Sequence, residues 1–346
     1  MKHLIAVGAC YLDTILTNVT STACTHDSKL RATSLNIRRG GNCPNSLQVL
    51  EQLLSEHDTL QLHLVSPLPA AASSATQRVI SSFGAQSSID FSHCIYREER
   101  TEAASSYIMR SEASGSRTLV NYNDLLEMTQ DEFGNIARGF NPDQETWWHF
   151  EGRIPDTIQS CIRLLRNVLP KATISVEIEK PGREGLPELA AEADVVFYSR
   201  SWAESRGHKT PEQCLRAEGH QKAYVSWKGY QASALAPLAL ADKKLHRSLA
   251  LCTWGEDGAA GLSRSTGKSI RCPALDEPGR DISVIDAVGA GDTFIAGMLY
   301  GLICHPDDWS MGKKLGFAVR LATLKVQREG FDGLGRDMLG TEIGGV

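Results

Sequence analysis

Short apolar segments alternate with longer segments of helical spacing along most of the chain. His3–Gly8 predicts a buried first strand, and Cys43–Leu54, with leucines at helical spacing, predicts a helix, as does Ala75–Phe83. Further strands are expected at Leu60–Val65, Trp147–Phe150, Ala172–Ile178, Asp194–Tyr198, Lys222–Trp227 and Ser248–Cys252. This alternation indicates an α/β fold in which a parallel sheet carries helices on both faces. Ligands in such sheets bind beyond the C-terminal ends of the strands.

A different pattern covers residues 93–122. Polar and apolar residues alternate in Ser105–Arg110 and Arg117–Tyr122, and Ser114-Gly115 between them is a turn signal, so we expect a hairpin. Ser34–Arg39 also indicates an exposed strand. Alternation is typical of a sheet with one face in water. We therefore expect a second, smaller sheet that serves as a lid or an interface.

The most informative segment is Asp286 to Phe294. An apolar run (Ile282 to Ile285) predicts a strand that ends near Asp286, and an apolar, helix-compatible run follows Phe294. The glycines between them permit a tight turn that opens a helix. Unpaired amides and the helix dipole make such a turn an anion site. Asp292 would repel a phosphate there, unless it accepts a proton from a hydroxyl that attacks the bound phosphorus.

Glycine-rich segments can also bind dinucleotides, form P-loops or make plain turns. The dinucleotide fingerprint requires a glycine where this chain has Phe294, and it normally follows the first strand. Ser265–Ser269 imitates the end of a P-loop, but the earlier glycine falls at Leu262 and the flanks resemble a hairpin. The structural alternative for Gly289 to Asp292 is a tight turn whose aspartate caps a helix.

Composition and charge narrow the class of protein. The 346 residues are 42% hydrophobic and 22% charged, which suits one large or two smaller soluble domains. A net charge of −5 argues against nucleic acid as a main partner. The nine cysteines include no Cys-x-x-Cys pair, so reduced thiols are expected rather than a metal or disulfide framework. No signal peptide or membrane-length apolar run is evident, and a cytoplasmic protein is expected.

Several polar residues follow expected strands or open helices. Asp13 comes after the first strand, and Gly41, Asn42 and Asn45 surround the start of the next helix, so their side chains could hold several hydroxyls of a sugar. The same residues also suit ordinary turns and caps. Arg117 in the hairpin could clamp a phosphate or a sugar oxygen.

Acidic residues and a glycine-rich loop lie at other strand ends. Glu177 and Glu179 share one face of a strand, which suits sugar hydroxyls or water bound to Mg²⁺, or simply a solvated strand end. Glu151 ends another strand. The loop Gly255 to Gly261 would let a nucleotide lie against the backbone, although such loops are often plain turns.

These segments match a known family. Asp286 to Phe294 is similar to the signature Asp-Thr-x-Gly-Ala-Gly-Asp-Thr-Phe of pfkB carbohydrate kinases, with Ala287 in place of the usual threonine. Arg39-Gly40-Gly41-Asn42, followed by Asn45, matches the first half of that family. Further motifs resemble its ketohexokinase-like branch, in the same order: Glu112 to Thr118, His149 to Arg153, Val176 to Pro181, Asp194 to Phe197 and Gly330 to Gly333. The chain thus resembles the pfkB, or ribokinase-like, sugar kinases over nearly its whole length.

The resemblance implies a fold and an assembly. The fold would be a ribokinase-like three-layer α/β/α sandwich with a mostly parallel central sheet and a small β-sheet lid. Residues 1–346 would form a single domain, with a lid from about 9–40 and 93–123. Family members use ATP with Mg²⁺, and several need a monovalent cation such as K⁺ near the signature loop. Lid sheets of two subunits clasp in the ketohexokinase-like branch, which implies a homodimer.

The resemblance also implies roles for residues. Asp292 would be the general base, and Gly289, Ala290 and Gly291 would form the anion hole. The sugar would contact Asp13, Gly41, Asn42, Asn45, Arg117 and Glu151. The nucleotide would contact Glu179, Thr253, Trp254, Gly255, Gly258, Lys325 and Arg328. The expected reaction is phosphorylation of a small sugar hydroxyl, with fructose converted to its 1-phosphate as the first expectation.

Some segments depart from the family. Cys43-Pro44 replaces small residues between the two asparagines, residues 206–248 look like an insertion in which Gln231–Ala241 could be helical, and an Asn-x-x-Glu motif is not evident near Ser199 to Glu204. Two other functions stay open: a kinase of the same fold for ribose, a nucleoside or another sugar, and a non-catalytic sugar-binding regulator. Retention of Asp292 beside its glycines argues against the regulator, because a pure binder does not need a base there.

Overall fold

An eight-stranded sheet forms the centre of the molecule. The computed structural model describes residues 1–17, 31–110, 117–218, 249–274 and 282–343, so the expected strand Lys222–Trp227 and helix Gln231–Ala241 lie outside the described residues. The strand order is β14-β13-β12-β11-β10-β9-β1-β4. The strands are β1 (Lys2–Val7), β4 (Leu60–Val65), β9 (Thr146–Phe150), β10 (Thr173–Ile178), β11 (Val195–Tyr198), β12 (Leu249–Thr253), β13 (Ala259–Ser263) and β14 (Ser269–Cys272). Pairing from β4 to β12 is parallel, and β13 and β14 add an antiparallel edge.

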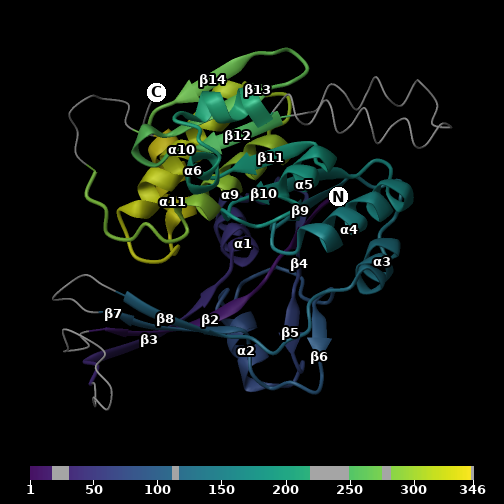
Figure 1. Cartoon of the computed structure of the whole chain (residues 1–346), viewed down its shortest axis with the longest axis vertical. Helices are drawn as coiled ribbons and strands as arrows, with labels where there is room; N and C mark the ends of the chain where they lie inside the picture. Colours follow the sequence, from purple (N-terminus) through teal and green to yellow (C-terminus); the bar gives the residue numbers. More distant parts are fainter. Residues whose placement is uncertain (18–30, 111–116, 219–248, 275–281, 344–346) are drawn as a thin grey trace.

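Helices pack on both faces of this sheet (Figure 1). Because successive residues of a strand point to opposite faces, Leu4 and Ala6 of β1 join one core cluster and Ile5 and Val7 join the other. The first cluster includes residues of α1 (Asn42–Leu53), α2 (Ser74–Ser81), α9 (Ala290–Ile303), α10 (Met311–Val326) and α11 (Leu334–Ile343). The second includes residues of α3 (Gln130–Arg138), α4 (Pro155–Val168), α5 (Leu186–Glu192) and α6 (Arg200–Ser205). The predicted three-layer α/β/α architecture is confirmed.

A four-stranded sheet projects from the body as a lid (Figure 1). Its order is β3-β2-β7-β8, with bounds β2 (Tyr11–Thr17), β3 (Ser34–Gly40), β7 (Ser105–Arg110) and β8 (Arg117–Tyr122). The predicted hairpin from 105 to 122 is present as β7 and β8. One strand inside the range assigned to the lid lies elsewhere: β6 (Ile95–Arg97) pairs with β5 (Pro67–Pro69) in a separate small sheet.

The prediction of a strand that ends near Asp286 is wrong. Residues 282–287 are irregular, and Val284 and Ile285 are 62% and 57% exposed, so this apolar run does not mark a buried strand. The backbone amides of Ile285 and Asp286 bond instead to the carbonyl of Val326, at the end of α10. The hairpin interpretation of Ser265–Ser269 is confirmed, because this segment joins β13 to β14.

The described residues contain neither a membrane-spanning helix nor a disulfide bond. No helix among them combines the length and the apolar character needed to cross a bilayer. Their cysteines form no disulfide bond with one another. A short 3-10 helix, η1 (Gly255–Asp257), follows β12, and residues 211–218 are also helical.

Candidate active site

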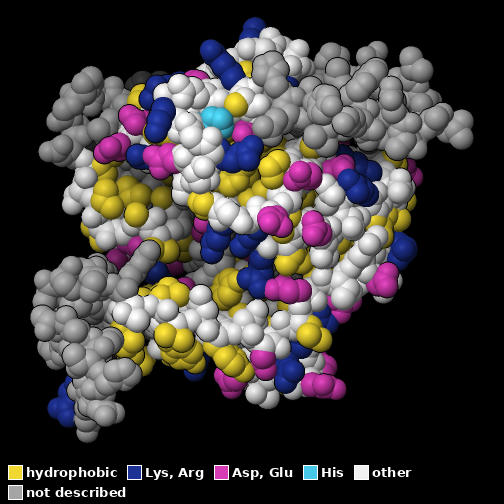
Figure 2. All heavy atoms as spheres, in the orientation of Figure 1, with side chains coloured by type: hydrophobic (Ala, Val, Ile, Leu, Met, Phe, Trp, Pro, Cys, Tyr) yellow, Lys and Arg dark blue, Asp and Glu magenta, His cyan; other side chains and the backbone are white. Residues whose placement is uncertain are grey.

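A cavity of 660 Å³ lies between the body and the lid sheet. From the body it is lined by residues at the carboxyl ends of three parallel strands: Glu177 and Glu179 at β10, Tyr198 at β11 and Thr253 at β12. Figure 2 shows the hollow between the lid and the body. Ligands of parallel α/β sheets bind at this edge. The cavity is therefore the candidate active site.

Two helices begin at this cavity, and each is preceded by a glycine that no other residue could replace without strain. Gly41, before α1, has a φ of 113°, and a Cβ there would lie 2.2 Å from the Ala9 carbonyl oxygen. Gly289, before α9, has a φ of 79°, and a Cβ would lie 2.4 Å from the Phe331 ring. Helix starts leave backbone N–H groups without intrahelical partners and carry positive potential. Gly289 and Gly291 line the cavity, so the start of α9 offers it an anion site.

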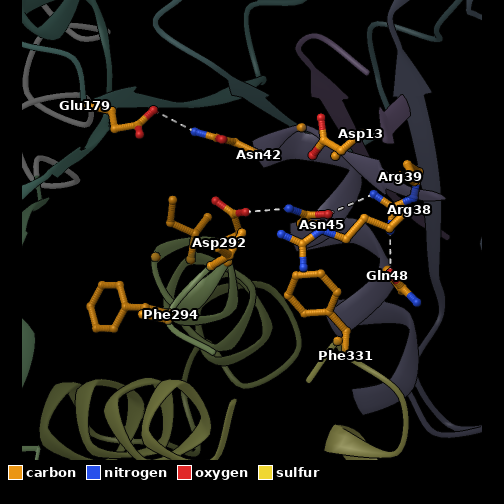
Figure 3. Close-up of a pocket in the computed structure, with 18 of the residues that line it drawn as sticks. Asp13, Arg38, Arg39, Asn42, Asn45, Gln48, Glu179, Asp292, Phe294 and Phe331 are labelled. Carbon is orange, nitrogen blue, oxygen red and sulfur yellow. Dashed lines mark hydrogen bonds between the residues drawn. The ribbon is translucent and has the colours of Figure 1, made fainter. Parts of the chain in front are cut away.

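Asp292 stands in the first turn of α9 and is held from α1 (Figure 3). Asn45 Nδ2 donates to Asp292 Oδ2 at 2.8 Å, and Arg39 Nη1 donates to Asn45 Oδ1 at 3.0 Å. Because a guanidinium can only donate, it fixes the Asn45 amide with its nitrogen toward Asp292. Arg39 also donates to Gln48, and Ser46 Oγ donates to the Asp292 carbonyl at 3.0 Å. The Asp292 carboxylate on α9 is therefore bonded to Asn45 on α1.

Burial raises the pKa of Asp292 well above its ordinary value. The charges of Glu177, Glu179 and Glu151 raise the pKa further, whereas the Asn45 hydrogen bond lowers it. A carboxylate accepts a proton best when its pKa lies near the working pH. Asp292 therefore has the placement and the electrostatic surroundings of a general base.

A chain of hydrogen bonds fixes the orientation of Glu177. Trp147 Nε1 donates to Ser175 Oγ at 2.8 Å, and Ser175 Oγ lies 2.8 Å from His149 Nδ1. The indole can only donate, so Ser175 Oγ accepts from it, and His149 Nε2 lies 2.8 Å from Glu177 Oε1. Burial lowers the pKa of His149 to about 3, which keeps the ring neutral. Asn42 Nδ2 donates to the second oxygen of Glu177 at 2.7 Å.

Asn42 joins two carboxylates at the cavity. The same Nδ2 donates to Glu179 Oε2 at 2.9 Å (Figure 3). Burial raises the pKa of Glu177 to about 8, and the neighbouring Glu179 charge adds to the rise. Both oxygens of Glu177 have protein partners, whereas the partner of Glu179 occupies one oxygen. Hard carboxylate oxygens suit Mg²⁺, so Glu179 fits a magnesium-binding role better than Glu177.

Asp13 reaches the cavity from the lid. It lies on β2 opposite Arg38 of β3, and both residues line the cavity. A Cβ at Gly40 would lie 2.6 Å from Asp13 Oδ2, so the absence of a side chain at Gly40 leaves room for the carboxylate. Burial raises the pKa of Asp13. Asp13 thus brings a carboxyl group from the lid to a cavity that the start of α9 also lines.

Most of the predicted site residues come together at this cavity. Those that line it are Asp13, Gly41, Asn42, Asn45, Glu179, Thr253, Gly289, Gly291 and Asp292. Those that do not line it are Ala290, Glu151, Trp254, Gly255, Gly258, Lys325 and Arg328. Arg117 is the first residue of β8, and its side chain lies outside the described part of the chain.

Three of these residues have other contacts that explain their position. Glu151 is turned to the backbone, where its Oε2 accepts a bond from Ala9 N at 2.9 Å, and burial raises its pKa to about 7. Lys325 has no exposed surface, and its ammonium faces Asp286. Arg328 Nη1 pairs with Asp337 Oδ2 at 2.8 Å. The side chains of Glu151 and Lys325 thus have protein partners and do not line the cavity.

The loop after β12 is tightly packed beyond Thr253. Trp254 is buried, and the Arg200 guanidinium lies 5.6 Å from its ring centre. Gly258 has a φ of 82°, and a Cβ there would lie 2.0 Å from the Cys272 carbonyl oxygen. Gly255 begins η1. In this part of the loop the glycines serve the turn onto β13, and Thr253 is its cavity residue.

Sequence reasoning missed several cavity residues: Arg38, Arg39, Gln48, Arg78, Tyr198, Phe331 and Asp332. Arg39 and the segment Gly330 to Gly333 were recognised as parts of family motifs without any role. Their neighbours in the fold come from distant parts of the chain. Gln48 Nε2, for example, donates to Asp332 Oδ1 at 3.3 Å across 284 residues.

Comparison with known protein families identifies the class of this chain. The model of the pfkB family carbohydrate kinases matches residues 1–333. This family match covers the cavity at the sheet edge, the two helix starts after glycines and the buried aspartate. The chain belongs to the pfkB family of carbohydrate kinases. Membership implies ATP as the phosphoryl donor, usually with Mg²⁺.

Individual kinases are similar to this chain over nearly its whole length. It is 27% identical to ketohexokinase of Mus musculus over 343 residues, which cover 96% of this chain and 99% of the relative. A ribokinase of Arabidopsis thaliana complexed with ribose and ATP has a TM-score of 0.67 at 15% identity, covering 97% of each chain. A nucleoside kinase of Methanocaldococcus jannaschii has a TM-score of 0.63 at 17% identity, covering 98% of this chain and 99% of that one. These structural likenesses show the ribokinase-like fold.

Proposed function

We propose that this sugar kinase transfers the γ-phosphoryl group of ATP to the primary 1-hydroxyl of a ketohexose, with fructose as the first substrate to test. The observation that carries the chemistry is the position of Asp292, which is buried, fixed by Asn45 and set in the first turn of the helix that supplies the anion site. The 27% identity with a ketohexokinase supports the choice of ketohexose.

The residues of this chain supply positioning and charge. Asp13 and Asn42 hold hydroxyls of the sugar, and Asp292 takes the proton from the hydroxyl that attacks. The backbone amides of Gly289 and Gly291, which line the cavity, stabilise the negative charge on the transferred phosphoryl group. Glu179 would hold the Mg²⁺ that accompanies ATP, and this ion neutralises phosphate charge when bound. Thr253 marks the side on which the adenosine part lies.

A substrate panel tests this function. Purified protein is incubated with MgATP and, in turn, with fructose, ribose, glucose and adenosine, and ADP release is measured. We expect the highest kcat/KM with fructose and a 1-phosphate product by NMR. A preference for ribose or adenosine would redirect the proposal to another kinase of this fold. Sugar binding by calorimetry without ADP release would contradict catalysis and indicate a regulator.

We also propose that two copies associate through the lid sheet. Strand register aligns Ile37, Tyr107 and Val120 in one row, with Leu35 and Tyr122 two residues further along their strands on the same face. These five residues, the lid stripe, are 39–63% exposed. Figure 2 shows apolar side chains exposed along the lid. Contiguous exposed apolar surface of this kind marks interaction sites.

A further inference from the structure

Lys325 is a fully buried lysine whose ammonium is surrounded by oxygen atoms. It lies in the last turn of α10 and has no exposed surface. Its Nζ donates to the Asp286 carbonyl oxygen at 2.9 Å, to Asp286 Oδ2 at 3.1 Å and to the Arg328 carbonyl oxygen at 3.4 Å. An ammonium has three N–H donors, and here each finds an acceptor. Burying a charge without such partners would be strongly unfavourable.

The main partner of Lys325 begins the turn that forms the anion site. Asp286 Oδ1 accepts a bond from Val288 N at 3.0 Å, which closes the backbone just before Gly289. The amides of Ile285 and Asp286 bond to the carbonyl of Val326, next to Lys325 in the chain. The end of α10 is therefore fastened to the turn through both side-chain and backbone contacts.

A second contact leads from Lys325 to the same turn. Its Nζ lies 5.4 Å from the centre of the Phe331 ring, close enough for a cation–π attraction. That ring occupies the space beside Gly289, since a Cβ there would lie 2.4 Å from it. Asp286 bonds to the residue before Gly289, Phe331 lies beside Gly289, and Lys325 contacts both of them.

We infer that Lys325 is a positioning residue for phosphoryl transfer: its ammonium fixes the Asp286 turn and, through it, the amides at the start of α9. The inference rests on the proposed function, because those amides matter only if they bind the transferred group. Misplacement of such groups by about 1 Å can lower a rate about 10²-fold. The charge, the three-oxygen acceptor set and the burial together distinguish Lys325 from a lysine that merely packs.

Chemical rescue tests this role. Lys325→Ala removes the ammonium and leaves a space lined by the Asp286 and Arg328 oxygens. We expect kcat to fall about 10²-fold with a smaller change in KM, and ammonium chloride to restore part of it, whereas tetramethylammonium chloride, too large for the space, should not. Lys325→Met keeps the volume without the charge, so it should lose kcat and show no rescue. Wild-type turnover measured in the same salts corrects for general salt effects.

A matched control lies on the same helix. Lys314 is 5% exposed, and its Nζ donates to the Pro306 carbonyl oxygen at 2.7 Å, away from the cavity. Lys314→Met should lower the melting temperature and leave kcat near wild type. Equal loss of kcat in both methionine variants, or near-normal kcat in Lys325→Ala, would overturn the inference.

A second readout does not depend on catalysis. Ammonium chloride should raise the melting temperature of Lys325→Ala above the value in tetramethylammonium chloride, and it should not do so for Lys325→Met. This result would show that the charge holds the turn even if the wild-type protein failed to phosphorylate any sugar, in which case only the proposed function would fail. No difference between the two salts would overturn the assigned role of the ammonium.

Discussion

Acidic residues dominate the candidate site. Asp292, Glu177, Glu179 and Glu151 influence one another, and burial raises the pKa of Asp292, Glu177 and Glu151. Structural salt bridges would lower these values instead. Asp292 and Glu177 line one cavity, and carboxylates with raised pKa at a cavity are typical of functional sites that accept protons or bind cations. The arrangement matches the needs of a kinase, which must hold a hydroxyl and MgATP together.

The raised pKa of Glu177 predicts a pH dependence of stability. The unfolded chain releases this proton near pH 4.5, and the folded protein releases it near pH 8. Stability contributed by Glu177 is therefore full below pH 4.5 and is lost as the pH rises to about 8, by up to about 1.4 kcal/mol per pH unit. His149 and His63, with pKa values lowered to about 3 and about 4, act in the opposite sense below pH 6.5. The carboxylate effect should therefore be clearest between pH 6.5 and 8.

Urea unfolding of Glu177→Gln measures this effect. The wild-type midpoint should fall between pH 6.5 and 8, and the fall should be smaller in the variant, which has no proton to release there. Glu56→Gln, a change at an exposed glutamate, serves as the control and should follow the wild type. Identical slopes in wild type and Glu177→Gln would contradict the raised pKa.

The sequence predicted the roles of some single residues but not their partners in the fold. Asp292 was predictable because its chemistry depends on glycines within three positions of it. Its partners were not, since Asn45 lies 247 residues away and only the fold brings the two together. Lys325 was assigned to the nucleotide because the family resemblance implies that the segment around it contacts ATP. Nothing local shows that this side chain turns inward to Asp286.

At the scale of elements, the site depends on where two helices begin. Both α1 and α9 start after a glycine in the left-handed region or close to it, and both starts line the same cavity. The helices also pack on each other within one core. A small shift of either start would move Asn45 relative to Asp292. The geometry of the base is therefore set by packing of whole elements.

Gly289→Ala tests this dependence. An alanine would be forced to a φ near 79° and would meet the Phe331 ring at 2.4 Å, so we expect a loss of about 1–3 kcal/mol in the free energy of unfolding, together with lower kcat. Thermal melting and turnover measure the two effects. Gly340→Ala, at an exposed position in α11 where a Cβ meets nothing within 4 Å, should be neutral or slightly stabilising. Equal stability of both variants would contradict the account.

Periodicity predicted most elements and misjudged one important segment. Buried strands of the body were recognisable because both of their faces are apolar, as Ile5 and Leu4 of β1 illustrate. The same rule failed before Asp286, where apolar Val284 and Ile285 are exposed in an irregular segment. An apolar run does not reveal whether the fold offers it a neighbouring strand. Here the backbone amides of Ile285 and Asp286 donate to the Val326 carbonyl at the end of α10.

At the scale of the whole molecule, the lid sheet has two different faces. One carries Asp13 and Arg38 to the cavity, and the other carries the lid stripe, because alternation along a strand separates the two sets. Of the lid stripe, Ile37 also lines the cavity, whereas Leu35, Tyr107, Val120 and Tyr122 do not. These four exposed residues are therefore available to a second copy of the chain.

Sedimentation of lid variants tests the proposed association. We expect the wild type to sediment as a dimer and Val120→Glu to sediment as a monomer, because the added charge would be buried in the interface. Leu126→Glu is the control: Leu126 is 70% exposed but lies outside the lid strands, and it should stay dimeric. A wild-type monomer at micromolar concentration, or a dimeric Val120→Glu, would contradict assembly through the lid stripe.

The most direct test of the account is the turnover of Asp292→Asn. Asparagine keeps the size of the side chain and an oxygen that can face Asn45, but it cannot act as a base. We predict that kcat falls about 10²–10⁴-fold while the affinity for MgATP, measured by calorimetry, stays within about two-fold of wild type. Asp143→Asn, a change at an exposed aspartate that does not line the cavity, should keep most of the turnover. Near-normal turnover by Asp292→Asn would contradict the central claim that this carboxylate accepts the proton during phosphoryl transfer.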